Sequence, residues 1–175
     1  MAKQEKQKMT KDVVPEGFTL GLALVDAIPV IVFGVNAILL SMLFKGGSLL
    51  FLLGGILCLV SGAIKVLWKV IVVLKKKNVW WMFMQMRIVM PLGFVLMIVA
   101  MIVDHAKWSF AGLWAGFTSM PSLIFFIIGI LGMVGMGVLG AKLDSSDVKS
   151  NWIEQTDNSI AQIAICIGII FLLIK

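Results

Sequence analysis

The chain has 175 residues, of which 61% are hydrophobic and only 14% are charged, and its formal net charge is +6. Soluble domains carry about 45–50% apolar and about 25% charged residues, so this composition excludes an ordinary soluble fold and indicates an integral membrane protein. The two cysteines, Cys58 and Cys166, belong to no paired motif, and no disulfide framework is expected. The basic residues cluster beside apolar runs, which is typical of membrane orientation rather than of nucleic-acid binding.

Five apolar segments are long enough, or nearly so, to cross a bilayer as helices, which takes about 20 residues. Backbone groups in lipid need internal partners, so the spans are expected to be helical. The sequence therefore predicts an all-α membrane protein built as a bundle of five transmembrane helices. A polar cytoplasmic tail, residues 1–17, precedes them. The expected spans cover residues 18–44, 48–74, 79–103, 121–141 and 158–174.

The connectors between the spans add three expectations. Gly46 and Gly47 predict a tight turn that makes the first two spans an antiparallel pair. Residues 108–120 are apolar and aromatic, but the segment is too short to cross the membrane, which predicts a short interfacial or re-entrant helix. The alternative is that this segment and the fourth span form one long, kinked helix. The polar residues 144–157 predict a short amphipathic helix on the cytoplasmic surface, with Asp157 capping the last span.

The distribution of lysines predicts the orientation. With a cytoplasmic N-terminus, nine lysines fall in inner segments and three in outer segments. Because positive residues favour the cytoplasmic side, we expect a multi-pass protein of the cell membrane with its N-terminus inside and its C-terminus outside. The inner lysines are Lys3, Lys6, Lys8, Lys11, Lys75, Lys76, Lys77, Lys142 and Lys149, and the outer ones are Lys45, Lys107 and Lys175.

Four ionisable residues on three different spans fall at a similar depth. At 1.5 Å per residue, Asp26, Lys65, Lys69 and Arg87 each lie about 9–15 Å from the cytoplasmic end of their span. Intramembrane charges cost about 2.5–3.5 kcal/mol each on insertion scales, so they usually face inward and find partners. Lys65 and Lys69 share one helix face, which predicts that one of them reaches Asp26.

The same layer has a functional and a structural interpretation. If all four residues are ionised, the layer carries a charge of +2, and a hydrated vestibule there would attract anions. Alternatively, the basic side chains extend to the interface or form a simple ion pair with Asp26. Pro29 predicts a helix kink close to Asp26. Asn36, nearer the outside, is a further binding candidate or else an interhelical hydrogen-bonding group.

The fourth span is rich in glycine, which predicts close helix packing within the subunit or between copies. A flexible helix or the lining of a narrow pore is the alternative use of these residues. The glycines are Gly129, Gly132, Gly135, Gly137 and Gly140.

The functional hypothesis is a small transporter or channel. Its charged layer would bind a small solute or ion, and the net positive charge of that layer would favour an anion. The candidate binding or coupling residues are Asp26, Lys65, Lys69, Arg87 and Asn36. Five helices are few to enclose a pathway, so we expect a homo-oligomer.

The alternative hypothesis is a non-catalytic subunit or scaffold that packs against another membrane protein. Hydrolase, metalloprotease and nucleotide-binding motifs are missing from the sequence, and nothing in it supports an enzyme, a cofactor, a metal site or a nucleic-acid partner.

Overall fold

The structure, a computed structural model, describes residues 11, 12, 14–143 and 147–174, with the backbone alone for residues 140 and 141. Most of the polar tail, residues 1–17, therefore lies outside the described residues. The described part is helical and contains no strand, which confirms the predicted fold class. Its helices are α1 (Leu20–Ser41), α2 (Leu49–Lys75), α3 (Trp80–Met84), α4 (Met86–Val103), a 3-10 turn η1 (His105–Lys107), α5 (Phe110–Thr118), α6 (Ser122–Lys142) and α7 (Val148–Leu173).

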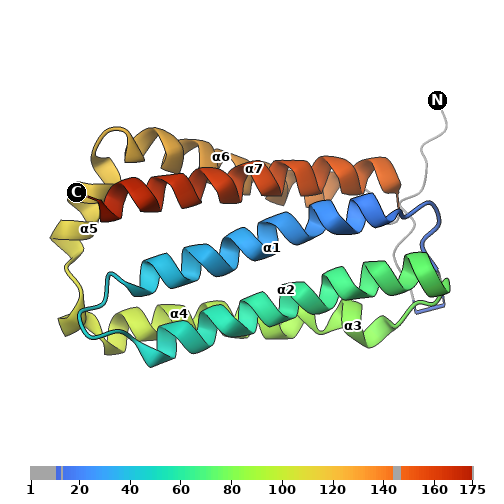
Figure 1. Ribbon diagram of the computed structural model, residues 1–175, viewed down its shortest axis with the longest axis horizontal. Helices are drawn as coiled ribbons and strands as arrows, with labels where there is room; N and C mark the ends of the chain where they lie inside the picture. Colours follow the sequence, from blue (N-terminus) through green and yellow to red (C-terminus); the bar gives the residue numbers. More distant parts are fainter. Residues whose placement is uncertain (1–10, 13, 144–146, 175) are drawn as a thin grey trace.

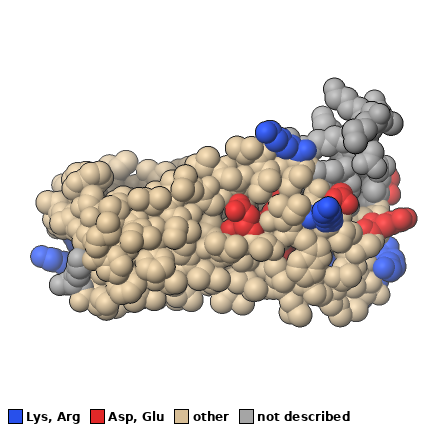
Figure 2. Space-filling view, turned by 90° about the horizontal axis from the view of Figure 1, so that it is seen from above, with Lys and Arg blue, Asp and Glu red and all other residues tan. Residues whose placement is uncertain are grey.

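The surface of the molecule is that of a multi-pass membrane protein. Five helical segments of the described chain are long and apolar enough to cross a membrane, with α3 and α4 together forming the third. Figure 2 shows a broad uncharged surface along most of the length, with the charged side chains gathered mainly toward one end. Exposed leucine, isoleucine and valine side chains cover this surface, as expected where lipid replaces water as the solvent.

The five spans form an open row rather than a closed ring. In the order α4, α2, α1, α7, α6, each helix packs against the next, and α1 lies at the centre of the row (Figure 1). The backbones of the two end helices, α4 and α6, stay apart within the described residues, with no Cα atom of one within 8 Å of a Cα atom of the other. The row therefore leaves a space between its ends, and the cavities described below lie there.

Small residues set the close approach of neighbouring helices. A Cβ added at Gly93 of α4 would lie 2.7 Å from the Gly54 carbonyl oxygen and 2.5 Å from the Cys58 sulfur of α2. On the other side of α2, a Cβ added at Gly62 would lie 2.8 Å from Val30 of α1. Lipid supplies no hydrophobic force between helices, so close van der Waals packing of this kind holds the row together.

The third span is interrupted at Gln85, between α3 and α4. Ser61 of α2 donates its hydroxyl to Gln85 Oε1 at 3.0 Å, and Gln85 Nε2 donates to the Ser61 carbonyl at 2.9 Å and to the Met82 carbonyl at 3.2 Å. A break in a membrane helix needs such replacement partners, because the apolar surroundings provide none. The break is thus tied to α2 by side-chain hydrogen bonds.

The connectors at the far end of the row follow the sequence expectations. Gly46 and Gly47 both have φ of +78°, which is the left-handed conformation that glycine adopts without strain, and they turn α1 into α2. The short helix α5 precedes α6 and exposes Trp114. α5 ends at Thr118, and Ser119 is extended, so α5 and α6 are two helices rather than one kinked helix.

The last helix differs most from the sequence expectation. α7 begins at Val148 and runs unbroken to Leu173, so the polar segment is part of this span and not a separate surface helix. Asp147 caps it by accepting the Ser150 backbone N–H at 2.8 Å. This hydrogen bond and that of the Ser150 hydroxyl hold the pKa of Asp147 below its ordinary value. Asp157, expected as the cap, lies within the helix with its carboxylate beside Gly135 of α6.

Candidate functional site

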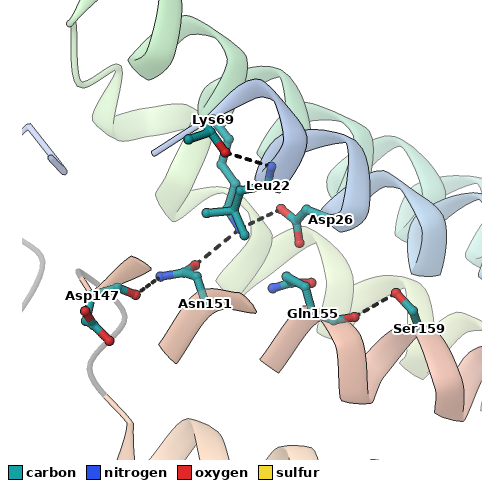
Figure 3. A network of polar contacts seen from close by, with 8 residues as sticks. Leu22, Asp26, Lys69, Asp147, Asn151, Gln155 and Ser159 are labelled. Atoms are coloured by element: carbon teal, nitrogen blue, oxygen red, sulfur yellow. Dashed lines mark hydrogen bonds and ion pairs between the residues drawn. The ribbon is translucent and has the colours of Figure 1, made fainter. Parts of the chain in front are cut away.

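An ion pair joins three helices near the end of the bundle where α1 begins. Lys69 of α2 places its Nζ 3.0 Å from Asp26 Oδ2 of α1. The same Nζ donates to Asn151 Oδ1 of α7 at 3.3 Å. Asp26 and Asn151 point toward Lys69 from neighbouring helices in Figure 3. The sequence prediction that a lysine of span two reaches Asp26 is confirmed, and Asn151 is an additional partner.

The ion pair is shielded from water. The side chains are 2% exposed for Lys69 and 5% for Asp26. The Lys69 ammonium lies 5.7 Å from the centre of the Phe18 ring, and Phe18 packs edge-on against Trp68. Phe18 and Trp68 belong to a buried apolar cluster at this end of the row. Lys69 therefore does not extend to the membrane interface, and its charge is balanced inside the protein.

One face of α7 carries a line of polar residues into the membrane. They extend over about 16 Å of the helix, at 1.5 Å per residue. We call them the polar stripe, and its members are Asn151, Gln155, Asn158, Ser159 and Gln162. All are buried except Asn158, which is half-buried. Intramembrane polar groups are unfavourable in lipid, so they are expected to face the protein interior or a hydrated cavity.

The polar stripe borders a groove between the two ends of the row. Two cavities of about 150 Å³ each lie there, and five residues line both of them, so they form one continuous groove. Each is roughly ten times the 10–15 Å³ that a water molecule needs. The shared residues are Pro29, Val30, Met90, Met136 and Asn158.

The two halves of the groove differ in chemistry. We call the half nearer the ion pair the charged cavity, because Asp26, Lys65 and Glu154 line it together with Gln155. The other half, the apolar cavity, lies between aromatic and methionine side chains, with Gln162 as its further polar residue. Its main apolar lining residues are Phe33, Met90, Phe94, Met133 and Met136. A solute in this groove would pass from a charged to a mainly apolar environment.

The charge of this site differs from the sequence estimate of +2. The estimate counted Arg87, but the Arg87 side chain is exposed and stacks over Phe83 at 5.6 Å. It also omitted Glu154, which the structure places in the charged cavity with Lys65. With Asp26 balanced by Lys69, the charges that line the cavity sum to about zero. Figure 2 shows acidic atoms within the uncharged surface, away from both ends of the molecule.

Asn36 and Pro29 occupy defined places on α1. Asn36 is buried and donates its Nδ2 to the Gln162 carbonyl at 3.3 Å and to Gln162 Oε1 at 3.2 Å. It thus joins α1 to the polar stripe but does not line the groove. Pro29 lies within α1, is buried, and lines both cavities. A proline leaves the carbonyl four residues earlier, here that of Val25, without its usual helical donor.

The predicted glycine face is divided in the structure. Gly129 and Gly132 pack closely on α7, where an added Cβ would lie 2.4 Å from Ile165 and 2.7 Å from Ala161, respectively. A Cβ added at Gly135 would lie 3.5 Å from the Asp157 carboxylate, whereas one added at Gly137 would have no contact within 4 Å. Gly140 belongs to α6, and its surroundings lie outside the described residues. The first two glycines therefore pack within the subunit.

Sequence reasoning missed the polar stripe and Glu154 because it began the last span near residue 158, whereas α7 begins at Val148. The stripe residues are spaced three and four apart, which is the period of one helix face, and this spacing is visible in the sequence. Within the described ranges, no group of three or more His, Cys, Asp or Glu side chains is placed to hold a metal ion.

Comparison with known proteins adds no family assignment, because no family model, curated protein or solved structure matches the chain.

Proposed function

We propose that this protein is a small transporter of the cell membrane and that its solute moves along the groove between α4 and α6. The polar stripe of α7 carries this proposal, because three of its members, Gln155, Asn158 and Gln162, line the groove over about 10 Å of the helix, at 1.5 Å per residue. A chain that needed only a stable apolar bundle would gain nothing from lining a cavity with Lys65, Glu154 and Asn158.

Each polar group has a distinct role in this mechanism. Lys65 and Glu154 receive the solute at the charged cavity, and Asn158 lies on the boundary to the apolar cavity. Asp26 lines the charged cavity, and its ion pair with Lys69 fixes α1, α2 and α7 relative to one another. The near-zero charge of this cavity gives less preference for a simple anion than the sequence count implied.

The lysine distribution supports a cytoplasmic N-terminus and an outer C-terminus. In that orientation the charged cavity opens from the cytoplasmic half of the membrane. The open row of helices favours assembly of several copies, since the backbones of its end helices, α4 and α6, do not pack against each other within the described residues.

Thiol accessibility tests whether the groove is hydrated. In a background with Cys58 and Cys166 replaced by alanine, Asn158→Cys should react with a membrane-impermeant thiol reagent. Ile160→Cys, two residues away on the exposed apolar face of α7, is the matched control and should not react. An unreactive thiol at position 158 would contradict a transport path through the groove.

A second candidate function is that of a membrane subunit bound to another membrane protein. The observation that favours it is Arg87, which is exposed on α4 and has no carboxylate within 4.0 Å among the described residues. An exposed arginine within a span is costly unless it reaches the interface or a partner. Native mass spectrometry of the gently extracted protein separates the two functions, because a fixed ratio to a second protein would favour the subunit.

A further inference from the structure

Two charged side chains within the spans have no counter-ion among the described residues, and the first is Asp157. It lies about 13–14 Å past the start of α7, at 1.5 Å per residue. Within the described part of the chain, no donor bonds to its buried Oδ2, and no basic side chain lies within 4.0 Å of its carboxylate. An intramembrane carboxylate is costly without a partner, and the short side chain of aspartate does not reach the interface from this depth.

Asp157 lines a shallow depression of about 390 Å³ on the surface of α7. Trp152 and Ile160 line the depression too, and Ile160 is 56% exposed. None of the residues that line the depression lines the groove, so it is a separate surface from the proposed transport path. Figure 2 views the molecule from the side of α6 and α7 and shows acidic atoms there within otherwise uncharged surface.

The second such charge is Arg87 of α4, the helix at the other end of the row. Its guanidinium lies 5.6 Å from the centre of the Phe83 ring, and no described carboxylate lies within 4.0 Å of it. Ile88, the next residue, is 73% exposed. α4 therefore presents a cation on an apolar outer surface, and this is the complement of the carboxylate in the depression.

The contacts between helices give the depth of Asp157. α1 and α7 run in the same direction, and Asn36 of α1 donates to Gln162 of α7 at 3.2 Å (Figure 1). Asp157 lies five positions before Gln162, so it is level with the residue five positions before Asn36. That residue follows Val30, and Asp157 therefore lies close to the level of Val30.

The same kind of contact places Arg87 at this level. Val30 packs on Gly62 of α2, where an added Cβ would lie 2.8 Å from it. Ser61, next to Gly62, donates to Gln85 Oε1 at 3.0 Å, and Arg87 follows Gln85 by two positions. Asp157 and Arg87 are therefore within about one helical turn, roughly 5 Å, of the same depth.

From these observations we propose that Arg87 of one copy pairs with Asp157 of a neighbouring copy of this chain. Copies insert in the membrane with the same orientation, so side chains of equal depth meet when the copies lie side by side. The pair neutralises both charges, and because it joins two different surfaces it forms a heterologous contact that can repeat from copy to copy. This contact belongs to the assembly suggested above, but it is independent of the transport path.

The test measures self-association of the purified full-length chain in phosphatidylcholine vesicles. Copies with donor or acceptor fluorophores fused to the N-terminus are mixed, and energy transfer is followed as lipid is added. Arg87→Gln and Asp157→Asn should each weaken self-association roughly thirtyfold or more, the effect of truncating one member of a desolvated charge pair. The controls Lys75→Gln and Glu16→Gln, which change exposed charges near the end of the bundle, should leave it unchanged.

A mixture of the two variants shows whether the pair forms between copies. Arg87→Gln keeps the carboxylate and Asp157→Asn keeps the guanidinium, so one pair forms when a copy of each meets. Energy transfer should therefore return when the donor is on one variant and the acceptor on the other. Thermal unfolding of each variant verifies that it is folded.

Crosslinking provides a second measurement that keeps both charges. In a background with Cys58 and Cys166 replaced by alanine, Ile88→Cys and Ile153→Cys are produced as separate chains with different tags. A short, membrane-permeant bifunctional thiol reagent should join the two chains when they share vesicles. Ile38→Cys, on the exposed surface of the central helix α1, is the matched control and should not be joined to Ile153→Cys.

The results separate this contact from the other proposals. Loss of self-association in both single variants, with recovery in their mixture, supports the pair. A natural chain that stays monomeric, single variants that associate normally, or a mixture without energy transfer would overturn it, and Arg87 would then be assigned to another partner. If Asn158→Cys reacts with the aqueous thiol reagent in that case, the transport path stands and only this inference fails. If the mixture recovers while Asn158→Cys does not react, the contact stands and the transport proposal fails.

Discussion

Removing the carboxylate of Asp26 should strongly destabilise the protein. At the observed 3.0 Å between Lys69 Nζ and Asp26 Oδ2, two unit charges attract by about 5.5 kcal/mol for an effective dielectric constant of about 20. The Asp26→Asn variant leaves the Lys69 ammonium buried beside neutral amide oxygens, that of Asn151 and that of the new side chain, with no carboxylate to balance its charge. Truncating one member of a buried pair typically costs about 3–5 kcal/mol, and we expect a loss in this range.

A double-mutant cycle measures the pair itself. The free energy of unfolding in mixed micelles would be compared for the natural chain, Asp26→Asn, Lys69→Met and the double variant. Because the double variant buries no charge at this place, it should be less destabilised than the sum of the two single changes, by several kcal/mol. Single variants within about 0.5 kcal/mol of the natural chain, or additive effects, would refute a dry, coupled pair.

Three further outcomes are expected from other parts of the structure. Gly93→Leu should lower the free energy of unfolding by about 1–3 kcal/mol or more, because an added Cβ would already lie 2.5 Å from the Cys58 sulfur of α2 and the larger side chain overpacks this contact. The control Gly137→Ala adds a Cβ with nothing within 4 Å and should change the free energy of unfolding by less than about 0.5 kcal/mol. Asn36→Leu removes the α1–α7 hydrogen bonds and should cost about 0.6–1.7 kcal/mol in the same assay. At the end of the bundle opposite the Asp26–Lys69 pair, a hydrogen bond from Ser48 holds the pKa of Asp104 below its ordinary value of 3.8. Ionised Asp104 therefore stabilises the fold at pH values above 3.8, and this contribution is lost as the pH falls through the lowered pKa. The unfolding temperatures of the natural chain and Asp104→Asn should therefore differ at neutral pH and converge in strong acid.

The sequence was sufficient for features that depend on distance along one helix. Five apolar runs predicted five spans, and Gly46 with Gly47 predicted the turn between the first two. The depth of Asp26, together with the four-residue spacing of Lys65 and Lys69, predicted an ion pair between spans one and two. These are one-dimensional properties, because the rise per residue and the thickness of a membrane are nearly constant.

The polar stripe of α7 shows why hydropathy alone was insufficient. Polar residues lower the hydropathy of a segment, so the first half of α7 resembled a surface helix. The structure packs α7 against α1. Asn151 accepts a hydrogen bond from Lys69 of α2, and Gln162 accepts one from Asn36 of α1. Polar groups enter a membrane protein when distant parts of the chain supply their partners, and the sequence of one segment does not reveal those partners.

The sequence by itself determined the number of spans and the depth of the charges, since both follow from helix rise and composition. Only the tertiary structure decided the order of helices in the row, the groove between α4 and α6, and the places of Glu154 and Arg87 relative to it. The rotation of a helix about its axis is set by contacts such as that of Gly93 with Gly54, across residues far apart in the chain. Side chains at equal depth can therefore face a common cavity, as Lys65 and Glu154 do, or lie apart from it, as Arg87 does.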